Sequence, residues 1–199
     1  MSKKRELPQP TIAEMKNDLK RERYRHRYRR VLRSTIGTLL VVAAVAVLAA
    51  TLWFPILKIF GSSMTPTLQE GQIVIAVKGH AFETGDIIGF YYGNKLLVKR
   101  YIAGPGDWIH INEDGVVFVN DEELIEPYLK ERALGDCNIE LPYQVPEGRY
   151  FVMGDHRSTS IDSRNTAVGC IAQEQVIGKI LLRVWPLPDF GNFDLGEVD

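Results

Sequence analysis

The sequence of 199 residues contains only two cysteines, Cys137 and Cys170, and four scattered histidines, at positions 26, 80, 110 and 156. None of the histidines lies at zinc-ligand spacing from a cysteine, so we expect no metal and no other cofactor. The two cysteines allow a disulfide in an oxidising compartment or a buried thiol, and the sequence leaves both interpretations open. Internal repeats and low-complexity segments are also absent, which excludes a repeat array.

Charge is absent from the 19 residues Ile36 to Phe54. A helix of about 20 residues crosses the hydrocarbon core of a bilayer, so this run predicts a transmembrane helix over residues 35–54. Trp53 and Phe54 supply an aromatic anchor at its far end. The apolar core of a cleaved signal peptide is only about 7–15 residues long, so a retained anchor is the better interpretation.

Acidic residues are few before this run. Residues 1–34 hold 12 of the 24 Lys and Arg beside four acids, a net charge of +8, whereas residues 35–199 carry a net charge of -9. A basic segment before an apolar run predicts that residues 1–34 are cytoplasmic and residues 55–199 extracytoplasmic. Residues 1–20 are polar and predict a disordered start. Residues 11–33 allow a basic helix that lies on anionic lipid or continues into the span, although a simple topology signal is the preferred explanation of the charge.

Helical periodicity is absent after the apolar run, and short β-type stretches alternate with Gly- and Pro-rich turns. The predicted strands are Pro55–Phe60, Gln72–Val77, Asp86–Tyr92, Lys95–Ala103, Trp108–Ile111, Val116–Val119, Ile139–Val145, Arg149–Met153 and Val176–Trp185. Residues 121–138 are charged and contain Pro127, so they predict an inserted surface loop. The pattern predicts a mainly β protein, in which a single N-terminal transmembrane helix precedes an all-β barrel or sandwich-like domain at 55–199.

The sequence contains no Gly-x-Ser-x-Gly motif to mark a nucleophile elbow. Ser63 instead follows the apolar run in a loop between Gly61, which permits a sharp turn, and Pro66, which stiffens the far side. Such a loop can hold a backbone N–H toward a developing oxyanion. A serine in a loop is common, however, and a serine nucleophile needs a nearby base.

Lys99 is the candidate base. Period-two alternation places Lys99 in the middle of its predicted strand, between Leu97 and Tyr101 on the same face. A solvated lysine has a pKa of about 10.4, and burial lowers that value because it disfavours the charged form. The alternative is an edge-strand lysine that prevents aggregation, and the spacing alone favours this interpretation.

Hydroxyls, carboxylates and guanidinium groups are concentrated in residues 154–164, which read GDHRSTSIDSR. One interpretation is a solvated turn held by local hydrogen bonds and Asp–Arg pairs, which fits Asp155 and Arg157. The other is a supporting shell that positions a catalytic lysine.

Together these stretches resemble bacterial signal peptidase I of the single-anchor type, a membrane-anchored Ser/Lys endopeptidase that removes signal peptides from exported proteins. The resemblance covers the anchor and nearly all of residues 56–188. Four stretches carry it, and they occur in the order of the family: Ser63–Leu68, Gly85–Phe90, Val98–Asp107 and Gly154–Arg164. One such match would be weak, but four in order behind one anchor are specific.

The resemblance implies that Ser63 is the nucleophile, that Lys99 is the general base, and that Ser160 orients the lysine. It also implies that Asp162 and Arg164 pair and hold their turn in place. The cut would follow an Ala-x-Ala-like site, and the candidate wall residues of the pockets for its two small side chains are Ile59, Phe60, Met64 and Ile87. The implied partners are signal-peptide-bearing preproteins, the lipid bilayer of a bacterial plasma membrane and the nearby export machinery, with no nucleic acid.

The sequence departs from the family pattern at two positions. Some members have a serine where this chain has Gly61, so we expect the oxyanion hole to use the Ser63 backbone N–H without a side-chain donor from that position. His156 stands where the family often has asparagine, and we interpret it as a tolerated surface change.

Two alternatives remain at this stage. A self-cleaving repressor carries a related serine loop, but the apolar run and the lack of a DNA-binding helical domain argue against it. A membrane-anchored, non-catalytic binding or assembly module could use the same fold. The joint presence of Ser63, Lys99 and Ser160 argues against that module.

Overall fold

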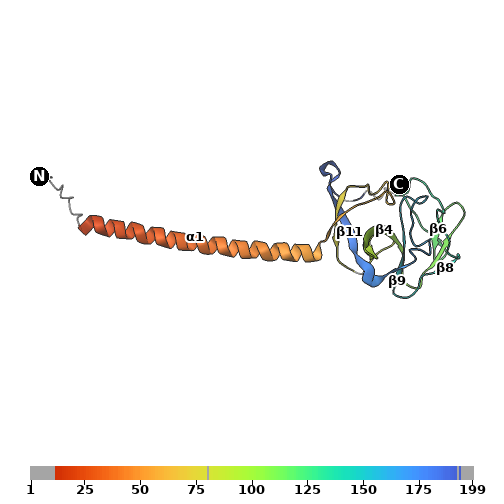
Figure 1. The fold of residues 1–199 in the computed structure, drawn as a ribbon, viewed down its shortest axis with the longest axis horizontal. Helices are drawn as coiled ribbons and strands as arrows, with labels where there is room; N and C mark the ends of the chain where they lie inside the picture. The colour runs from red at the N-terminus through yellow and green to blue at the C-terminus, as the bar shows by residue number, and fades with distance from the viewer. Residues whose placement is uncertain (1–11, 80, 192, 194–199) are drawn as a thin grey trace. The chain divides into compact units, whose positions relative to one another are not determined.

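The structure is a computed structural model that describes residues 12–79, 81–191 and 193 (Figure 1). Predictions that concern residues 1–11, His80, and the C-terminal positions 192 and 194–199 lie outside the described residues. The chain forms two compact units, one of which ends at Ala50 while the other begins at Thr51.

Helix α1 spans the 42 residues Ile12–Trp53 as one uninterrupted α-helix. It contains all the described residues of the first unit, and its last three residues belong to the second unit. Its part from Met15 to Trp53 is long and apolar enough to cross a membrane, by length and composition. The predicted span at 35–54 is therefore helical as far as Trp53. The disordered start predicted for residues 1–20 is wrong for residues 12–20, because Ala, Glu, Met, Lys and Leu in this stretch are strong helix formers.

The second unit is built of short strands, which confirms the mainly β prediction. The strands are β1 (Ile56–Lys58), β2 (Ile73–Val77), β3 (Ile87–Tyr92), β4 (Lys95–Ala103), β5 (Trp108–Ile111), β6 (Val117–Val119), β7 (Glu122–Glu123), β8 (Tyr143–Gln144), β9 (Arg149–Met153), β10 (Ile171–Ala172) and β11 (Val176–Trp185). Two 3-10 turns, η1 (Gln173–Gln175) and η2 (Leu187–Asp189), flank β11.

The strands form two sheets in which every pair is antiparallel. The larger sheet has the order β1-β2-β11-β3-β4-β9-β10, and the smaller one the order β7-β6-β5-β8. Figure 1 shows β4, β9 and β11 of the larger sheet and β6 and β8 of the smaller one. Strand β4 lies between β3 and β9, so its residues are inside the larger sheet rather than at an edge.

Two predicted strands are longer than the observed ones. Of the strand predicted at Pro55–Phe60, only Ile56–Lys58 forms β1. The strand predicted at Ile139–Val145 contains only the two residues Tyr143–Gln144 of β8. Pro142 directly precedes them, and a proline has no N–H to donate to a strand ladder. The two-residue strands β7 and β10 were not predicted, because so short a stretch has no detectable alternation.

Residues 121–138 are exposed along most of their length, as a surface insertion should be. Two side chains of this segment nevertheless point inward. Glu126 is 5% exposed and Tyr128 is 8% exposed, and both contact the arginines described below.

Three clusters of buried apolar side chains fill the interior. One cluster lies between the two sheets. It joins the C-terminal half of β4 and strand β9 of the larger sheet to β5 and β6 of the smaller one, and it includes Ile102, Ile109 and Phe151. Another joins β1, β2, β3 and β11 and includes Met64 and Leu68 from the loop that follows β1. The loop that carries Ser63 is therefore packed onto a core rather than detached from it.

Candidate active site

The Ser63 loop is fixed at both sides of the serine. Before it, Gly61 adopts a φ of +79°, a left-handed conformation that favours glycine, as its sharp turn predicted. After it, Met64 and Leu68 are 2% and 0% exposed, and the Leu68 N–H donates to the Met64 carbonyl over 2.8 Å. Ser63 itself is half-buried, so its position is set by the buried residues that follow it.

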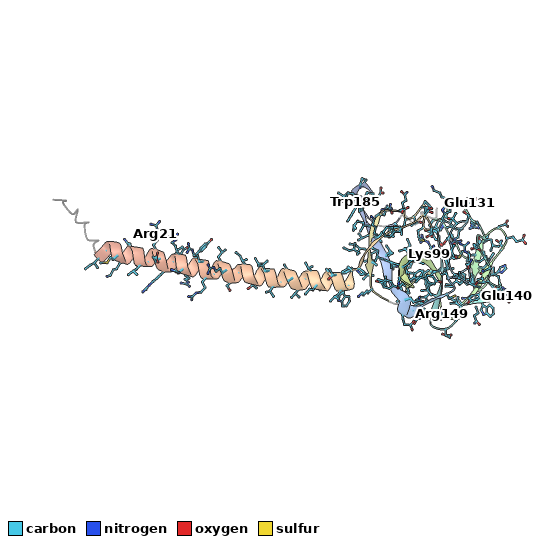
Figure 2. All side chains as sticks on the ribbon, viewed as in Figure 1. Arg21, Lys99, Glu131, Glu140, Arg149 and Trp185 are labelled. Atoms are coloured by element: carbon cyan, nitrogen blue, oxygen red, sulfur yellow. The ribbon has the colours of Figure 1, made fainter. Side chains whose placement is uncertain are left out.

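Lys99 lies in the interior of the second unit (Figure 2). It is paired with Ile88 of β3, one residue before the pairing of β4 with β9 begins at Arg100. Lys99 is only 4% exposed, and its Nζ donates a hydrogen bond to Ser160 Oγ over 2.8 Å. Burial lowers the pKa of Lys99 from 10.5 to about 8, although the nearby Asp162 carboxylate partly opposes this shift. The edge-strand alternative is wrong, because β4 lies between β3 and β9.

Asp162 and Arg164 form a buried pair with two guanidinium–carboxylate contacts, of 2.8 Å from Nε and 2.9 Å from Nη2. Burial by itself raises the pKa of Asp162, but the hydrogen bonds and charge of Arg164 outweigh it and hold the pKa below its ordinary value of 3.8. Arg164 also donates to the Leu134 carbonyl over 2.7 Å. The pair thus ties the turn at 160–164 to the inserted segment.

Gly154 is the point at which the serine loop and the Ser160 turn meet. A Cβ at this position would lie 2.2 Å from Ser160 Oγ and 2.5 Å from the Ser63 carbonyl oxygen. The Gly154 N–H donates to Asp162 Oδ2 over 2.9 Å. Sequence reasoning gave this glycine no role, because a close approach of backbone to distant residues leaves no local signal.

Replacement of Gly154 by alanine is expected to reduce the peptidase activity that the resemblance implies at least about a hundredfold, because the methyl group must displace either Ser63 or Ser160. The measurement is cleavage of a preprotein by the purified full-length variant in detergent. Gly79→Ala is the matched control, since nothing lies within 4 Å of a Cβ there. Equal activity of the two variants would contradict this account of the junction.

Two further buried ion pairs lie near the site, and each contains one residue that the sequence analysis assigned to a solvated turn. Asp155 and Arg157 are not parts of a solvated turn, because they are 2% and 1% exposed. Asp155 pairs with Arg100, whose Nε donates to Oδ1 over 2.8 Å, and Arg157 pairs with Glu126. The Arg100 guanidinium carbon also lies 3.6 Å from the centre of the Tyr128 ring, a cation–π contact. Each partner lies far away in the sequence, which is why a local pattern did not reveal it.

A small cavity lies beside Ser63. It has a volume of about 30 Å³, and its lining includes three of the residues predicted for the substrate pocket, namely Ile59, Phe60 and Met64. Leu96 and Val98 of β4 also line it, and sequence reasoning did not name them. Ile87 does not reach this cavity but lies in the core cluster that contains Ile59 and Met64, at 3% exposure.

His156 is half-buried, and its Nδ1 lies 3.1 Å from Thr65 Oγ1. The side chain of this histidine is therefore not free at the surface, because it contacts the serine loop. That the change is tolerated stays a prediction. Among the described residues, no three His, Cys, Asp or Glu side chains cluster so that they could hold a metal ion.

Both cysteines are unpaired. Cys137 is half-buried, while Cys170 is 6% exposed and its Sγ lies 3.9 Å from the Tyr143 hydroxyl. Burial raises the pKa of the Cys170 thiol, which keeps it protonated and unreactive.

The fold and the site describe a β-rich protein with an N-terminal apolar helix and a buried lysine joined to a serine. The family model of the signal peptidases, peptidase S26, matches residues 32–185. The chain is 33% identical over 174 residues to signal peptidase I U of Bacillus subtilis (strain 168), a match that covers 79% of this chain and 90% of that relative. It is 35% identical over 150 residues to signal peptidase IB of Staphylococcus aureus, covering 65% of this chain and 77% of the relative.

A crystal structure of a signal peptidase I from Enterococcus faecalis matches with 29% identity and a TM-score of 0.41, covering 50% of this chain and 96% of that one. The match to the family model covers most of the chain. The chain therefore belongs to the signal peptidase family, peptidase S26.

Proposed function

We propose that the protein is a membrane-anchored serine endopeptidase in which Ser63 and Lys99 form a catalytic dyad. As a member of its family, it is a peptidase that removes signal peptides from preproteins. The observation that carries the proposal is the state of Lys99, which is buried, bonded to Ser160, and has a pKa lowered to about 8.

A lowered pKa makes Lys99 able to act as a base near neutral pH. With a pKa of about 8, roughly a quarter of the lysines are neutral at about pH 7.5, against about one in a thousand for a solvated lysine. Ser160 would hold Nζ in one direction, and the Asp162–Arg164 pair would hold Ser160 in place through Gly154. Gly154 in turn lies against Ser63, so the same glycine helps to position both members of the dyad.

In the proposed mechanism, neutral Lys99 takes the proton of the Ser63 hydroxyl as its oxygen attacks the scissile carbonyl. The Ser63 backbone N–H stabilises the developing oxyanion. The protonated lysine then gives its proton to the leaving amine, which departs as the new N-terminus of the mature protein. A water molecule, deprotonated by Lys99, hydrolyses the acyl-enzyme and releases the signal peptide with a free carboxyl group.

Selectivity for small side chains is part of the proposal. The cavity beside Ser63 has a volume of only about 30 Å³, which favours a methyl-sized group over a longer side chain. Ile59, Phe60 and Met64 contribute apolar side chains to its lining, beside Lys58 and Ser63. Both properties support cleavage after alanine in an Ala-x-Ala-like site.

The membrane topology is a further part of the proposal. Residues 1–34 would lie in the cytoplasm of a bacterium, residues 35–54 would cross the plasma membrane, and residues 55–199 would work outside it near the export machinery. The charge asymmetry and the length of α1 support this arrangement. A shared lipid bilayer would raise the effective concentration of the signal peptide around the enzyme.

The proposal is tested with the purified full-length protein in detergent and a preprotein that contains an Ala-x-Ala site. We expect one cut directly after the second alanine, identified by the mass of the new N-terminal peptide. A matched preprotein in which leucine replaces that alanine should remain uncut, because so small a cavity favours the shorter side chain. Cleavage at another position, or equal cleavage of both preproteins, would refute the assigned selectivity.

The same assay gives a pH dependence with a definite sign. Only neutral Lys99 can accept a proton, so kcat/KM should rise with pH and reach half of its maximum near pH 8. A histidine base would place this limb near about 6.5, and a solvated lysine would place it above about 10. If kcat/KM instead rises at about pH 6.5 or above about pH 10, the buried Lys99 is not the base.

A further inference from the structure

His156 is connected through its backbone to both parts of the site. Its N–H donates to the Ser63 carbonyl over 3.1 Å, and its own carbonyl accepts the Ser160 N–H over 3.0 Å. One residue thus touches the proposed nucleophile on one side and, on the other, the serine that holds Lys99.

The side chain of His156 reaches the same loop by a second path. Its Nδ1 lies 3.1 Å from Thr65 Oγ1, and that hydroxyl donates to the Ser62 carbonyl over 2.8 Å. A threonine hydroxyl has only one proton, so the proton shared with the ring must come from Nδ1. The hydrogen bonds therefore run from His156 Nδ1–H to Thr65, and from Thr65 to the residue before Ser63.

The two paths fix two successive peptide units, Ser62–Ser63 and Ser63–Met64. The Ser62 carbonyl is held through Thr65, and the Ser63 carbonyl is held by the His156 N–H. The Ser63 N–H belongs to the peptide unit that contains the Ser62 carbonyl, so its direction is set by this carbonyl. That N–H is the proposed oxyanion donor, and the value of such a donor depends on where it points.

We propose that His156 is a positioning residue of the reaction, whose imidazole orients the Ser62–Ser63 peptide unit through Thr65. This inference rests on the proposed function of Ser63 and Lys99. The ring acts through Thr65 rather than on the substrate, because its Nδ1 proton is already engaged there. Its effect falls on transition-state stabilisation and therefore on kcat, since oxyanion charge develops only after the substrate has bound.

The test compares His156→Phe, Thr65→Val and the double variant, all as full-length protein in detergent. His156 lines a cavity of about 330 Å³, so a phenyl ring has room at this position. We expect each single variant to lose kcat about ten- to a hundredfold while KM stays within about twofold, because the loop is displaced by a fraction of an ångström. The double variant should be no slower than the slower single one, because both remove the same path.

Two further variants make the result specific. His156→Asn should recover most of the lost kcat, since its amide can again donate a hydrogen bond. His110→Phe is the matched control, because that ring is exposed on β5 and contacts only the Phe118 ring among the described ring contacts. The thermal midpoints of His156→Phe and His110→Phe should agree.

Several outcomes would overturn the inference. These are a wild-type kcat in His156→Phe, a double variant whose loss is the product of the two single losses, or a loss of kcat that follows a lowered thermal midpoint. A loss of about a thousandfold with the disappearance of the pH limb would instead make His156 a base. A Ser63→Ala variant with full activity would refute the proposed function itself, whatever His156→Phe does, so the two failures are distinguishable.

Discussion

Replacement of Ser63 or Lys99 by alanine is expected to lower kcat/KM for preprotein cleavage at least about a thousandfold. Without the Ser63 hydroxyl no acyl-enzyme can form, and without Lys99 the hydroxyl has no buried base. Other lysines cannot replace it, because a solvated lysine is almost fully protonated near neutral pH. The measurement is cleavage of one preprotein under conditions that give the wild-type rate near pH 8.

The controls are chosen from the same elements. Lys95→Ala removes an exposed lysine at the start of β4, and Ser158→Ala removes an exposed serine in the 154–164 turn, so both should keep wild-type rates. The double variant Ser63→Ala with Lys99→Ala should be no slower than either single variant, because the two residues act as one unit. Wild-type turnover in Ser63→Ala or Lys99→Ala would rule out the dyad, and a wild type that binds preproteins without cutting them would favour a binding module.

Replacement of Arg164 by alanine is expected to destabilise the second unit by about 3–5 kcal/mol, because it leaves the Asp162 carboxylate buried without its guanidinium partner. Both side chains of this pair have 0% exposure, so water cannot replace the guanidinium. The matched control is Arg132→Ala, which breaks an ion pair whose side chains are 41% and 52% exposed. Such exposed pairs contribute only about 0–1 kcal/mol.

Thermal unfolding of the full-length variants in detergent measures the difference, and the pH dependence gives its sign. The pKa of Asp162 is lower in the folded protein than its ordinary 3.8, so the pair stabilises the fold above that value. This stabilisation is lost as the pH falls through the folded pKa. The gap between wild type and Arg164→Ala should therefore narrow in acid. A gap that stays constant, or equal midpoints for Arg164→Ala and Arg132→Ala at neutral pH, would contradict the assignment.

Local patterns predicted most of the strands because their signals are local. The alternation in residues 95–103 predicted strand β4, and the structure contains it with the predicted bounds, paired with β3. The same alternation could not show that β4 lies inside the sheet, because strand order depends on β9, which follows some fifty residues later. For this reason the edge-strand interpretation of Lys99 could not be dismissed from the sequence.

The candidate site shows the same division. Asp162 and Arg164 are two residues apart, and the sequence could suggest their pairing. Asp155 joins Arg100, 55 residues away, and no local pattern distinguishes this pair from a pair with the adjacent Arg157. His156 could not be placed either, because its partner Thr65 lies 91 residues earlier. Contacts between distant segments decide these cases, and they appear only when the chain is folded.

The cavity beside Ser63 and the hydrophobic interior share residues. Ile59 and Met64 line the cavity and also belong to the core cluster of β1, β2, β3 and β11. A substitution that widens the cavity for a larger substrate side chain therefore also removes packing from the core, at about 1 kcal/mol or more for each lost methylene. Under the proposed function, a change of cleavage preference therefore needs compensating changes in the β-sheet interior, and substrate range is coupled to the stability of the fold.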